Sequence, residues 1–261
     1  MRKLLFLLAL CLPVAAAGQT VSFTGRASVG GDYKIVKGVH LGVEEELRMG
    51  DGFSSLGSVR TGVSLSYRPL TFLKVKAGYT LINPWKKSWS NFNAPRHRVY
   101  MDLAGRYPVG DFQFFLKERL QLTHRTGSYN VYETTPYALA LKSSAGVKYK
   151  RFKRFEPSLS FEVRTALNDP WGTGVAAVDN HDNEYTAYTH TGYTHCYNNR
   201  YRTSLEADWV PAKHHVIAPY ILADYCCDYE INTDSSGKVL KSKGYSNEWL
   251  FCVGLGYVYK F

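Results

Sequence analysis

The sequence predicts an all-β fold, a closed antiparallel transmembrane β-barrel of 10–12 strands, from three observations. Apolar and polar residues alternate along most of the chain, as in strands with one apolar face. The alternating segments are about 10 to 14 residues long, whereas strands of globular proteins usually have about five or six, and a tilted strand needs about 9 to 11 residues to cross a bilayer. Short turns alternate with longer polar loops, which is how outer-membrane barrels are connected.

The composition excludes other classes of protein. Aromatic residues make up 15% of the 261 residues, with 20 Tyr among them, which argues against intrinsic disorder. Charged residues at 21%, a mean hydropathy of −0.27 and the absence of a long apolar run past residue 17 exclude a polytopic helical membrane protein. The net charge of +10 requires an explanation, and nucleic acid is the first partner to consider.

The chain begins with the three parts of a secretory signal peptide. Arg2 and Lys3 form a basic start, residues 4–12 form an apolar segment, and the small residues at 15–18 suit a signal peptidase. Cys11 lies inside the apolar segment directly behind a bulky residue, so a lipoprotein signal is excluded.

The expected domains are therefore a signal peptide at 1–18 and an outer-membrane β-barrel at 19–261. Export to the bacterial outer membrane excludes nucleic acid as a partner. It predicts outer-membrane lipids and lipopolysaccharide as the surroundings of the barrel.

Eleven segments are predicted to be strands. Their ranges are 20–35, 38–49, 57–68, 72–83, 96–108, 111–126, 138–150, 156–167, 199–210, 215–228 and 247–261. Single-chain bacterial barrels have even numbers of strands. We therefore expect ten or twelve, with twelve favoured: either a further strand lies within 168–199, or one of the eleven is not in the wall.

The connections between these segments differ in length. Short turns are expected at 36–38, 69–71, 108–111, 152–154 and 211–214, and longer polar loops at 50–57, 83–95, 127–135, 168–199 and 229–246. Turns of outer-membrane barrels face the periplasm and loops face the outside.

The apolar face of each strand is predicted to face lipid. Aromatic residues near the strand ends suit the two membrane interfaces; they are Tyr67, Tyr79, Tyr107, Tyr149, Trp209, Trp249, Tyr257, Tyr259 and Phe261. The alternative is a secreted soluble sandwich, in which the apolar residues of two sheets would pack against each other.

The polar face is predicted to line the lumen. A basic residue on the lipid face near the midplane would cost about 2–4 kcal/mol, so the basic side chains must point inward; they are Arg26, Arg48, Arg60, Arg68, Lys74, Lys76, Arg98, Arg106, Lys117, Arg119, Lys142, Lys148, Arg164, Arg200 and Arg202. The acidic residues predicted to point inward are Glu44, Glu46, Asp102, Glu162, Glu206 and Asp208. This basic lumen explains the net charge without nucleic acid.

Two acidic residues do not fit the alternation. Glu45 and Glu118 fall on the lipid face, at matching places in two similar segments. A β-bulge could turn each of them inward, or each could lie at a strand end near lipid headgroups. We favour the bulge.

Three motifs carry a resemblance to a known family. The last eight residues, GLGYVYKF at 254–261, resemble the terminal strand that the barrel-assembly machinery recognises. The segments at 96–103 and 115–121, together with VEEELR at 43–48, resemble a family of bacterial outer-membrane proteins with no assigned function. The resemblance implies barrel construction and supplies no catalytic residues.

The sequence contains no recognisable catalytic, cofactor or metal site, and we expect a non-enzymatic protein without cofactors. Histidines occur in the expected loops and turns; these are His181, His190, His195, His214 and His215. A lipid- or lipopolysaccharide-modifying enzyme remains an alternative, because His40, His97 or His124 could act with a nearby Ser or Asp.

The cysteines and basic runs leave further alternatives open. Export leaves Cys196, Cys226, Cys227 and Cys252, either as small apolar residues or with a disulfide from Cys196 to a later cysteine. The basic, aromatic runs at 150–154 and 85–89 are expected at the periplasmic rim and in an outer loop, where lipid phosphates would attract them.

The favoured function is that of an integral outer-membrane barrel, structural or forming a narrow pore. A basic lumen predicts a preference for anions if a channel remains open. A third hypothesis is a surface-binding barrel whose loops at 168–199 and 229–246 hold a partner.

Overall fold

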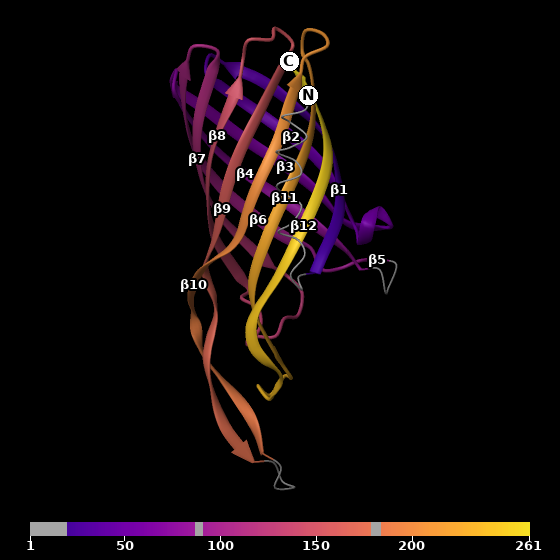
Figure 1. Cartoon of the computed structure of the whole chain (residues 1–261), viewed down its shortest axis with the longest axis vertical. Helices are drawn as coiled ribbons and strands as arrows, with labels where there is room; N and C mark the ends of the chain where they lie inside the picture. Colours follow the sequence, from indigo (N-terminus) through magenta and orange to yellow (C-terminus); the bar gives the residue numbers. More distant parts are fainter. Residues whose placement is uncertain (1–19, 87–90, 179–183) are drawn as a thin grey trace, which may run out of the picture.

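The long alternating segments form strands that close into a barrel, with two β-hairpins extending beyond one end (Figure 1). The computed structural model describes residues 20–86, 91–178 and 184–261. The predicted signal peptide lies outside these residues.

Within the described residues, eleven strands form the wall. They are β1 (Thr20–Val36), β2 (Val39–Gly50), β3 (Ser55–Leu70), β4 (Leu73–Lys86), β6 (Arg96–Val109), β7 (Phe112–Arg125), β8 (Tyr137–Tyr149), β9 (Phe155–Val178), β10 (Glu184–Trp209), β11 (His215–Thr233) and β12 (Val239–Lys260). The short β5 (Asn91–Phe92) pairs with the end of β4, and a 3-10 turn, η2 (Asp51–Phe53), links β2 to β3. No helix in this described part of the chain is long and apolar enough to cross a membrane.

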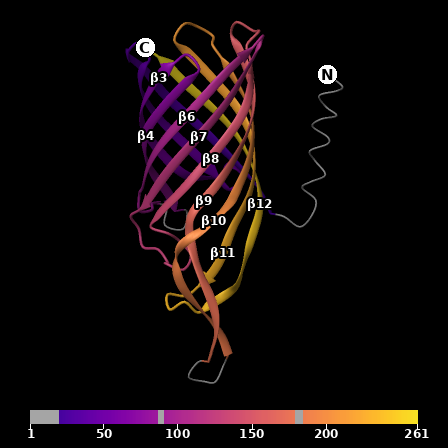
Figure 2. The same cartoon turned by 90° about the vertical axis from the view of Figure 1, so that its left-hand side faces the viewer.

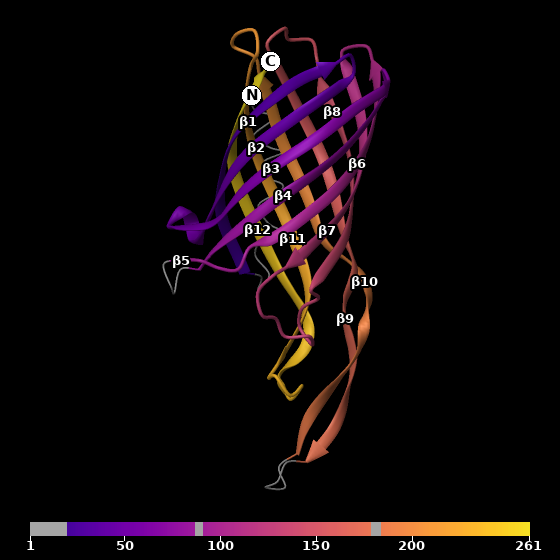
Figure 3. The ribbon, with the colours of Figure 1, turned by 180° about the vertical axis from the view of Figure 1, so that it is seen from behind.

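A parallel pair closes the barrel. Each wall strand pairs antiparallel with its neighbour in the sequence, except that β1 runs parallel to β12, with Thr20 opposite Glu248 and Asp32 opposite Lys260. Figure 3 shows these two strands side by side. We call this pairing the β1–β12 seam. Eleven strands are consistent with the predicted range of 10–12, but the expectation of an even number is wrong, because the parallel seam allows an odd one.

The two ends of the barrel are built differently (Figure 2). At the short-turn end, the connections β1–β2, β3–β4, β6–β7, β8–β9 and β10–β11 are brief, and the C-terminus lies there. Gly38 and Gly110 sit in two of these turns with φ of +85° and +57°, a backbone conformation that suits glycine. The opposite end, which we call the hairpin end, holds the longer β4–β6 and β7–β8 connections and the outer parts of β9 to β12.

Two of the predicted loops are partly strand. β9 and β10 continue through most of 168–199 as a two-stranded ribbon, and β11 and β12 continue into 229–246. The many Tyr and Thr residues in the outer part of β10 favour a strand over a loop. The additional strand considered within 168–199 is therefore an extension of β9 and β10 and adds no wall strand.

Burial in the barrel is the reverse of that in a soluble sandwich. Apolar side chains at alternate positions lie on the outside, where Phe23, Met101 and Leu116 are each more than half exposed. Buried side chains include the polar Asp102 and Asp224. The apolar residues of two sheets do not pack against each other, so the soluble-sandwich alternative is wrong.

The bulge predicted at the two acidic exceptions is absent. Glu45 pairs with Val29 and Thr61, and Glu118 pairs with Leu103 and Ser143, in uninterrupted register. Both therefore keep the outward side of the alternation, near the middle of their strands. The alternative placement at a strand end is wrong as well.

The outward Glu118 has a local partner. The Ser143 hydroxyl donates a hydrogen bond to the Glu118 carboxylate across β7 and β8, with an Oγ–Oε2 distance of 2.6 Å. A carboxylate in this position finds little water to solvate it if the outer face lies in lipid.

Candidate functional site

The candidate site is a charged cavity of about 480 Å³ inside the barrel, which we call the central cavity. Its described lining comes from nine strands, β1 to β4 and β6 to β10, so the space lies within the ring of the wall. Most contributing positions follow from alternation, because they have the parity opposite to that of the exposed apolar residues on their strands.

Basic residues outnumber acidic ones in this lining. Eleven basic side chains line the cavity; they are Arg26, Arg48, Arg60, Lys76, Arg98, Lys117, Arg119, Lys142, Arg164, Arg200 and Arg202. Among the described residues, four acidic side chains line it; they are Glu44, Glu46, Glu162 and Glu206. All of these side chains were expected on the inner face, and in the structure they line one cavity.

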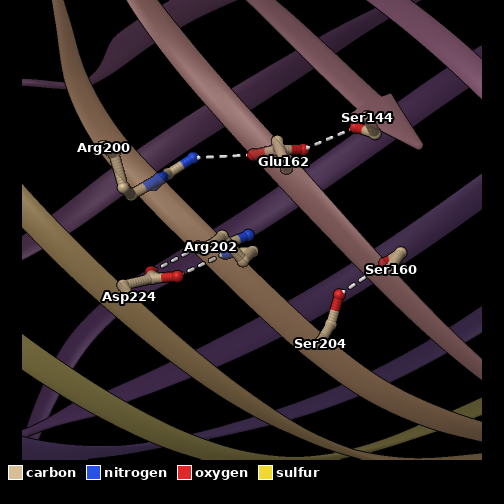
Figure 4. A network of polar contacts seen from close by, with 7 residues as sticks. All are labelled: Ser144, Ser160, Glu162, Arg200, Arg202, Ser204 and Asp224. Carbon is tan, nitrogen blue, oxygen red and sulfur yellow. Dashed lines mark hydrogen bonds and ion pairs between the residues drawn. The ribbon is translucent and has the colours of Figure 1, made fainter. Parts of the chain in front are cut away.

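Two bidentate ion pairs fix part of the wall. Arg119 donates from Nε and Nη2 to Asp102 at 2.6 and 2.7 Å. Arg202 donates to Asp224 through the same two atoms, at 2.6 Å each (Figure 4). In both pairs the residues are direct partners on neighbouring strands, so the sheet register itself brings them together.

A second network joins three strands beside the Asp224 pair. Arg200 Nη2 on β10 donates to Glu162 Oε1 on β9 at 3.1 Å, and the Ser144 hydroxyl on β8 donates to Glu162 Oε2 at 3.3 Å (Figure 4). The hydroxyls of Ser160 and Ser204 lie 2.7 Å apart farther along the same strands. These contacts order the inner face of β8 to β10.

One carboxylate is shared by two arginines. Glu46 accepts a hydrogen bond from Arg48 Nε, and Arg60 Nε lies 3.7 Å from the same oxygen, Oε1. Arg26 is the direct partner of Arg48 on β1. This side of the cavity therefore holds several guanidinium groups around one acidic group.

The interior continues toward the short-turn end. A further cavity of about 440 Å³ is lined by Lys74, Lys148, Glu156 and Asp208, among others. Lys117 and Glu206 line both cavities, so the two spaces meet at this level. Lys148 bonds Asp208 there and lies 3.7 Å from Glu156.

Aromatic rings lie flat over glycines on the inner wall. Tyr100 covers its direct partner Gly78, and Tyr220 covers its direct partner Gly254; a Cβ added to either glycine would overlap the ring. The Arg119 guanidinium lies 4.2 Å from the centroid of the Tyr100 ring, a cation–π geometry. The missing glycine side chains thus let large rings stay close to the wall.

Sequence reasoning missed Asp224, Tyr100 and Tyr220. Asp224 is 2% exposed and is the partner of Arg202, yet it sits in a segment whose alternation is interrupted by adjacent apolar and cysteine residues. The register between strands identifies all three residues, and a single sequence does not provide that register.

The histidines considered for catalysis are spread over the molecule. His97 Nδ1 lies 2.6 Å from the Tyr79 hydroxyl, and its ring stacks on that of His124 with a centroid distance of 6.2 Å. His40 Nδ1 lies 3.2 Å from Asp32 Oδ1 near the short-turn end. The hydrogen-bonding partner of His97 is therefore a tyrosine, whereas the enzyme alternative requires Ser or Asp.

The remaining histidines also lie apart. His190 and His195 lie on the protruding part of β10, whereas His214 and His215 lie at the β10–β11 turn. His181 lies outside the described residues. Across the described ranges, no three His, Cys, Asp or Glu residues gather as metal ligands would.

The four cysteines of the described chain are free thiols. Cys196 is exposed and Cys252 is buried, whereas Cys226 and Cys227 are half-buried. The disulfide considered between Cys196 and a later cysteine is therefore not formed in this structure.

The two basic, aromatic runs are separated by the length of the barrel. The run at 150–154 forms the exposed β8–β9 turn at the short-turn end. The run at 85–89 begins at the hairpin end of β4, where Trp85 meets Phe92 edge to face at 5.0 Å; residues 87–89 lie outside the described part.

The hairpin end carries an ordered lobe built from β9 to β12 and the β7–β8 connection. The Asn130 side chain donates to the Thr233 hydroxyl at 2.9 Å, and Glu133 accepts a hydrogen bond from the Thr233 backbone at 2.9 Å. In the β11–β12 turn, hydrogen bonding from the Ser236 side chain lowers the pKa of Asp234.

Comparison with known proteins gives a family match. A family described as "Protein of unknown function (DUF2490)" matches residues 27–181. No curated protein matches the chain.

The chain is also similar to a solved structure, "Outer-membrane expressed OmpT of Vibrio cholerae", with 10% sequence identity and a TM-score of 0.34. The match covers 80% of this chain and 61% of that one. A similarity this low carries no argument about function.

Proposed function

We propose that this chain, which belongs to the DUF2490 family of proteins of unknown function, is an integral barrel of the bacterial outer membrane whose basic lumen forms a narrow, anion-preferring pore. The excess of basic side chains in the central cavity is the observation that carries this proposal. The proposed role requires no catalytic step and no cofactor.

The outer face supports the membrane location. Exposed apolar side chains surround the wall, and water would disfavour so large an apolar surface. Aromatic residues such as Tyr67, Tyr107 and Trp209 lie toward the short-turn end, where they suit a membrane interface. Lipids and lipopolysaccharide are the proposed surroundings, and β12, ending beside Phe261, is the proposed contact with the barrel-assembly machinery.

The inner face supports the anion preference. Asp102 and Asp224 neutralise one arginine each, yet basic side chains still exceed acidic ones around the central cavity. Fixed positive charges around a narrow aqueous space attract anions and repel cations. Salt screens this field over about 10 Å at 0.1 M, so the preference should weaken as the salt concentration rises.

Planar-bilayer recording of the purified, refolded protein tests the proposal. Under a KCl gradient of fixed ratio, we expect a reversal potential of the sign given by chloride, which becomes smaller as both concentrations are raised. Replacing three lysines of the cavity lining with Gln should reduce the anion preference; they are Lys76, Lys117 and Lys142.

The matched control removes the same charge outside the lumen. Lys37, Lys153 and Lys213 are exposed at the short-turn end, and their replacement with Gln should leave the reversal potential nearly unchanged. A cation preference would contradict the proposed selectivity. Absence of conductance would eliminate the pore and leave a structural barrel.

A further inference from the structure

A small pocket at the hairpin end has a different composition from the central cavity. It has a volume of about 300 Å³ and lies where β6 begins and β7 ends, between the β5–β6 and β7–β8 connections. Arg96, Arg125 and Lys86 contribute to its lining. None of the described lining residues is acidic.

The two arginines are held directly opposite each other. Arg96 is the register partner of Arg125 on the neighbouring antiparallel strand. They alternate with the outward His97 and His124, so both arginines belong to the inner side of the wall. Like charges at directly opposed positions destabilise a sheet, which calls for a compensating negative charge.

The surroundings do not supply that compensation fully. Arg125 Nε is buried and has no hydrogen-bond partner among the described residues. Asp169 is the acidic residue whose charge acts on Arg125, but its carboxylate already accepts a hydrogen bond from the Tyr197 hydroxyl at 2.7 Å. A buried donor without a partner is unfavourable, so a bound anion would satisfy Arg125 as well as neutralise the pair.

The backbone around the pocket is fixed in place. The Arg125 backbone N–H donates to Pro136 at 3.0 Å, and the Thr126 hydroxyl donates to the Pro95 carbonyl at 2.7 Å. The two connections are thus tied to each other across the ends of β6 and β7. Ser128 adds a further hydroxyl to the lining.

We propose that this pocket binds a phosphate group, held between the Arg96 and Arg125 guanidinium groups. Planar guanidinium groups recognise oxyanions through paired hydrogen bonds, which a halide does not use. The phosphate can belong to a free solute approaching the lumen or to lipopolysaccharide at the barrel rim. The site is separate from the central cavity and does not depend on whether the barrel conducts ions.

Binding of inorganic phosphate to the full chain, refolded in detergent, tests the site directly. Isothermal titration should show saturable binding, and R96Q/R125Q should weaken it by at least about ten-fold, because hydrogen bonds to charged groups are the strong ones. R96K/R125K should recover part of the affinity, since it restores charge without the paired hydrogen bonds. R125Q alone serves if the double variant does not fold.

The matched control is R151Q/R154Q, which removes two exposed arginines from the β8–β9 turn at the opposite end. Its phosphate affinity should equal that of the unmodified protein. An equal loss in both double variants would show attraction by net charge and overturn the site, as would unchanged binding in R96Q/R125Q.

Competition separates the two sources of the phosphate. Displacement of inorganic phosphate by glycerol 3-phosphate, but not by lipopolysaccharide micelles, would identify a free solute. Displacement by phosphorylated lipopolysaccharide, but not by its dephosphorylated form, would identify the membrane. Failure of both competitors in the presence of saturable, Arg96- and Arg125-dependent phosphate binding would identify inorganic phosphate itself as the ligand.

Discussion

Replacing Asp224 with Asn tests whether the inner ion pairs hold the barrel together. Asp224 is 2% exposed, and its carboxylate accepts two hydrogen bonds of 2.6 Å from Arg202. The amide removes the negative charge and replaces one acceptor oxygen with a donor. Arg202, whose side chain is 14% exposed, would then be left as a buried charge without its full partner.

The expected loss follows from this burial. Removing one partner of a buried ion pair typically costs about 3–5 kcal/mol. The amide keeps one acceptor oxygen and Glu162 lies nearby, so we expect D224N to lower the free energy of unfolding by about 3 kcal/mol. The variant R202M/D224L removes both charges and should be more stable than D224N.

Urea titration of the protein in lipid vesicles, followed by tryptophan fluorescence, measures the free energy of unfolding. D234N is the control, because Asp234 lies in the β11–β12 turn and its carboxylate accepts hydrogen bonds from Ser236 and Lys238 within that turn. A D224N variant as stable as the unmodified protein would refute the reasoning. The reasoning would also be refuted if the changes in the free energy of unfolding caused by R202M and D224L added up in the double variant, because the effects of two residues in direct contact should not be additive.

Three further predictions concern the wall. T24C should form a disulfide with Cys252, the direct partner of Thr24 across the β1–β12 seam, whereas S22C should not; peptide mapping by mass spectrometry that finds no link to Cys252 in T24C would contradict the parallel register. E118L should raise the free energy of unfolding by about 1–2 kcal/mol, because a carboxylate on the lipid face is unfavourable; a loss of stability on urea titration would show that the hydrogen bond with Ser143 outweighs this cost. G254A should lower the free energy of unfolding by about 1–3 kcal/mol, since a Cβ there overlaps a tyrosine ring on the neighbouring strand; an unchanged urea midpoint would show that the ring moves aside without cost.

Features that depend on one strand at a time were predictable from the sequence. Alternation places an apolar residue outside and a polar one inside at every second position, so strand bounds and the inner basic residues follow locally. β9 and β10 were predicted too short because the outer part of β10 carries Tyr, Thr and His and that of β9 is rich in Gly and Ala. Neither a lipid-facing apolar stripe nor a charged inner stripe marks these parts. The ribbon is therefore continuous in structure, whereas its hydropathy pattern changes where it leaves the barrel.

Features that depend on which residues face each other were not predictable. The Arg202–Asp224 pair, the rings over Gly78 and Gly254 and the opposed Arg96 and Arg125 all follow from the register between strands. Shifting one strand by two residues would keep every side chain on its face yet separate all these partners. The candidate site was therefore predictable as a charged inner face, and its internal geometry was not.

The odd number of strands has a consequence for the chain ends. In a barrel of antiparallel hairpins, the first and last strands run in the same direction when the count is odd, so the seam must be parallel. β1 therefore starts at the hairpin end and β12 finishes at the short-turn end, so these two strand ends lie at opposite ends of the barrel along one seam. Parallel pairing is slightly less stable per residue than antiparallel pairing, but here it runs without interruption from Thr20 to Asp32. The length of the seam thus offsets its weaker geometry, and an even count is not required for closure.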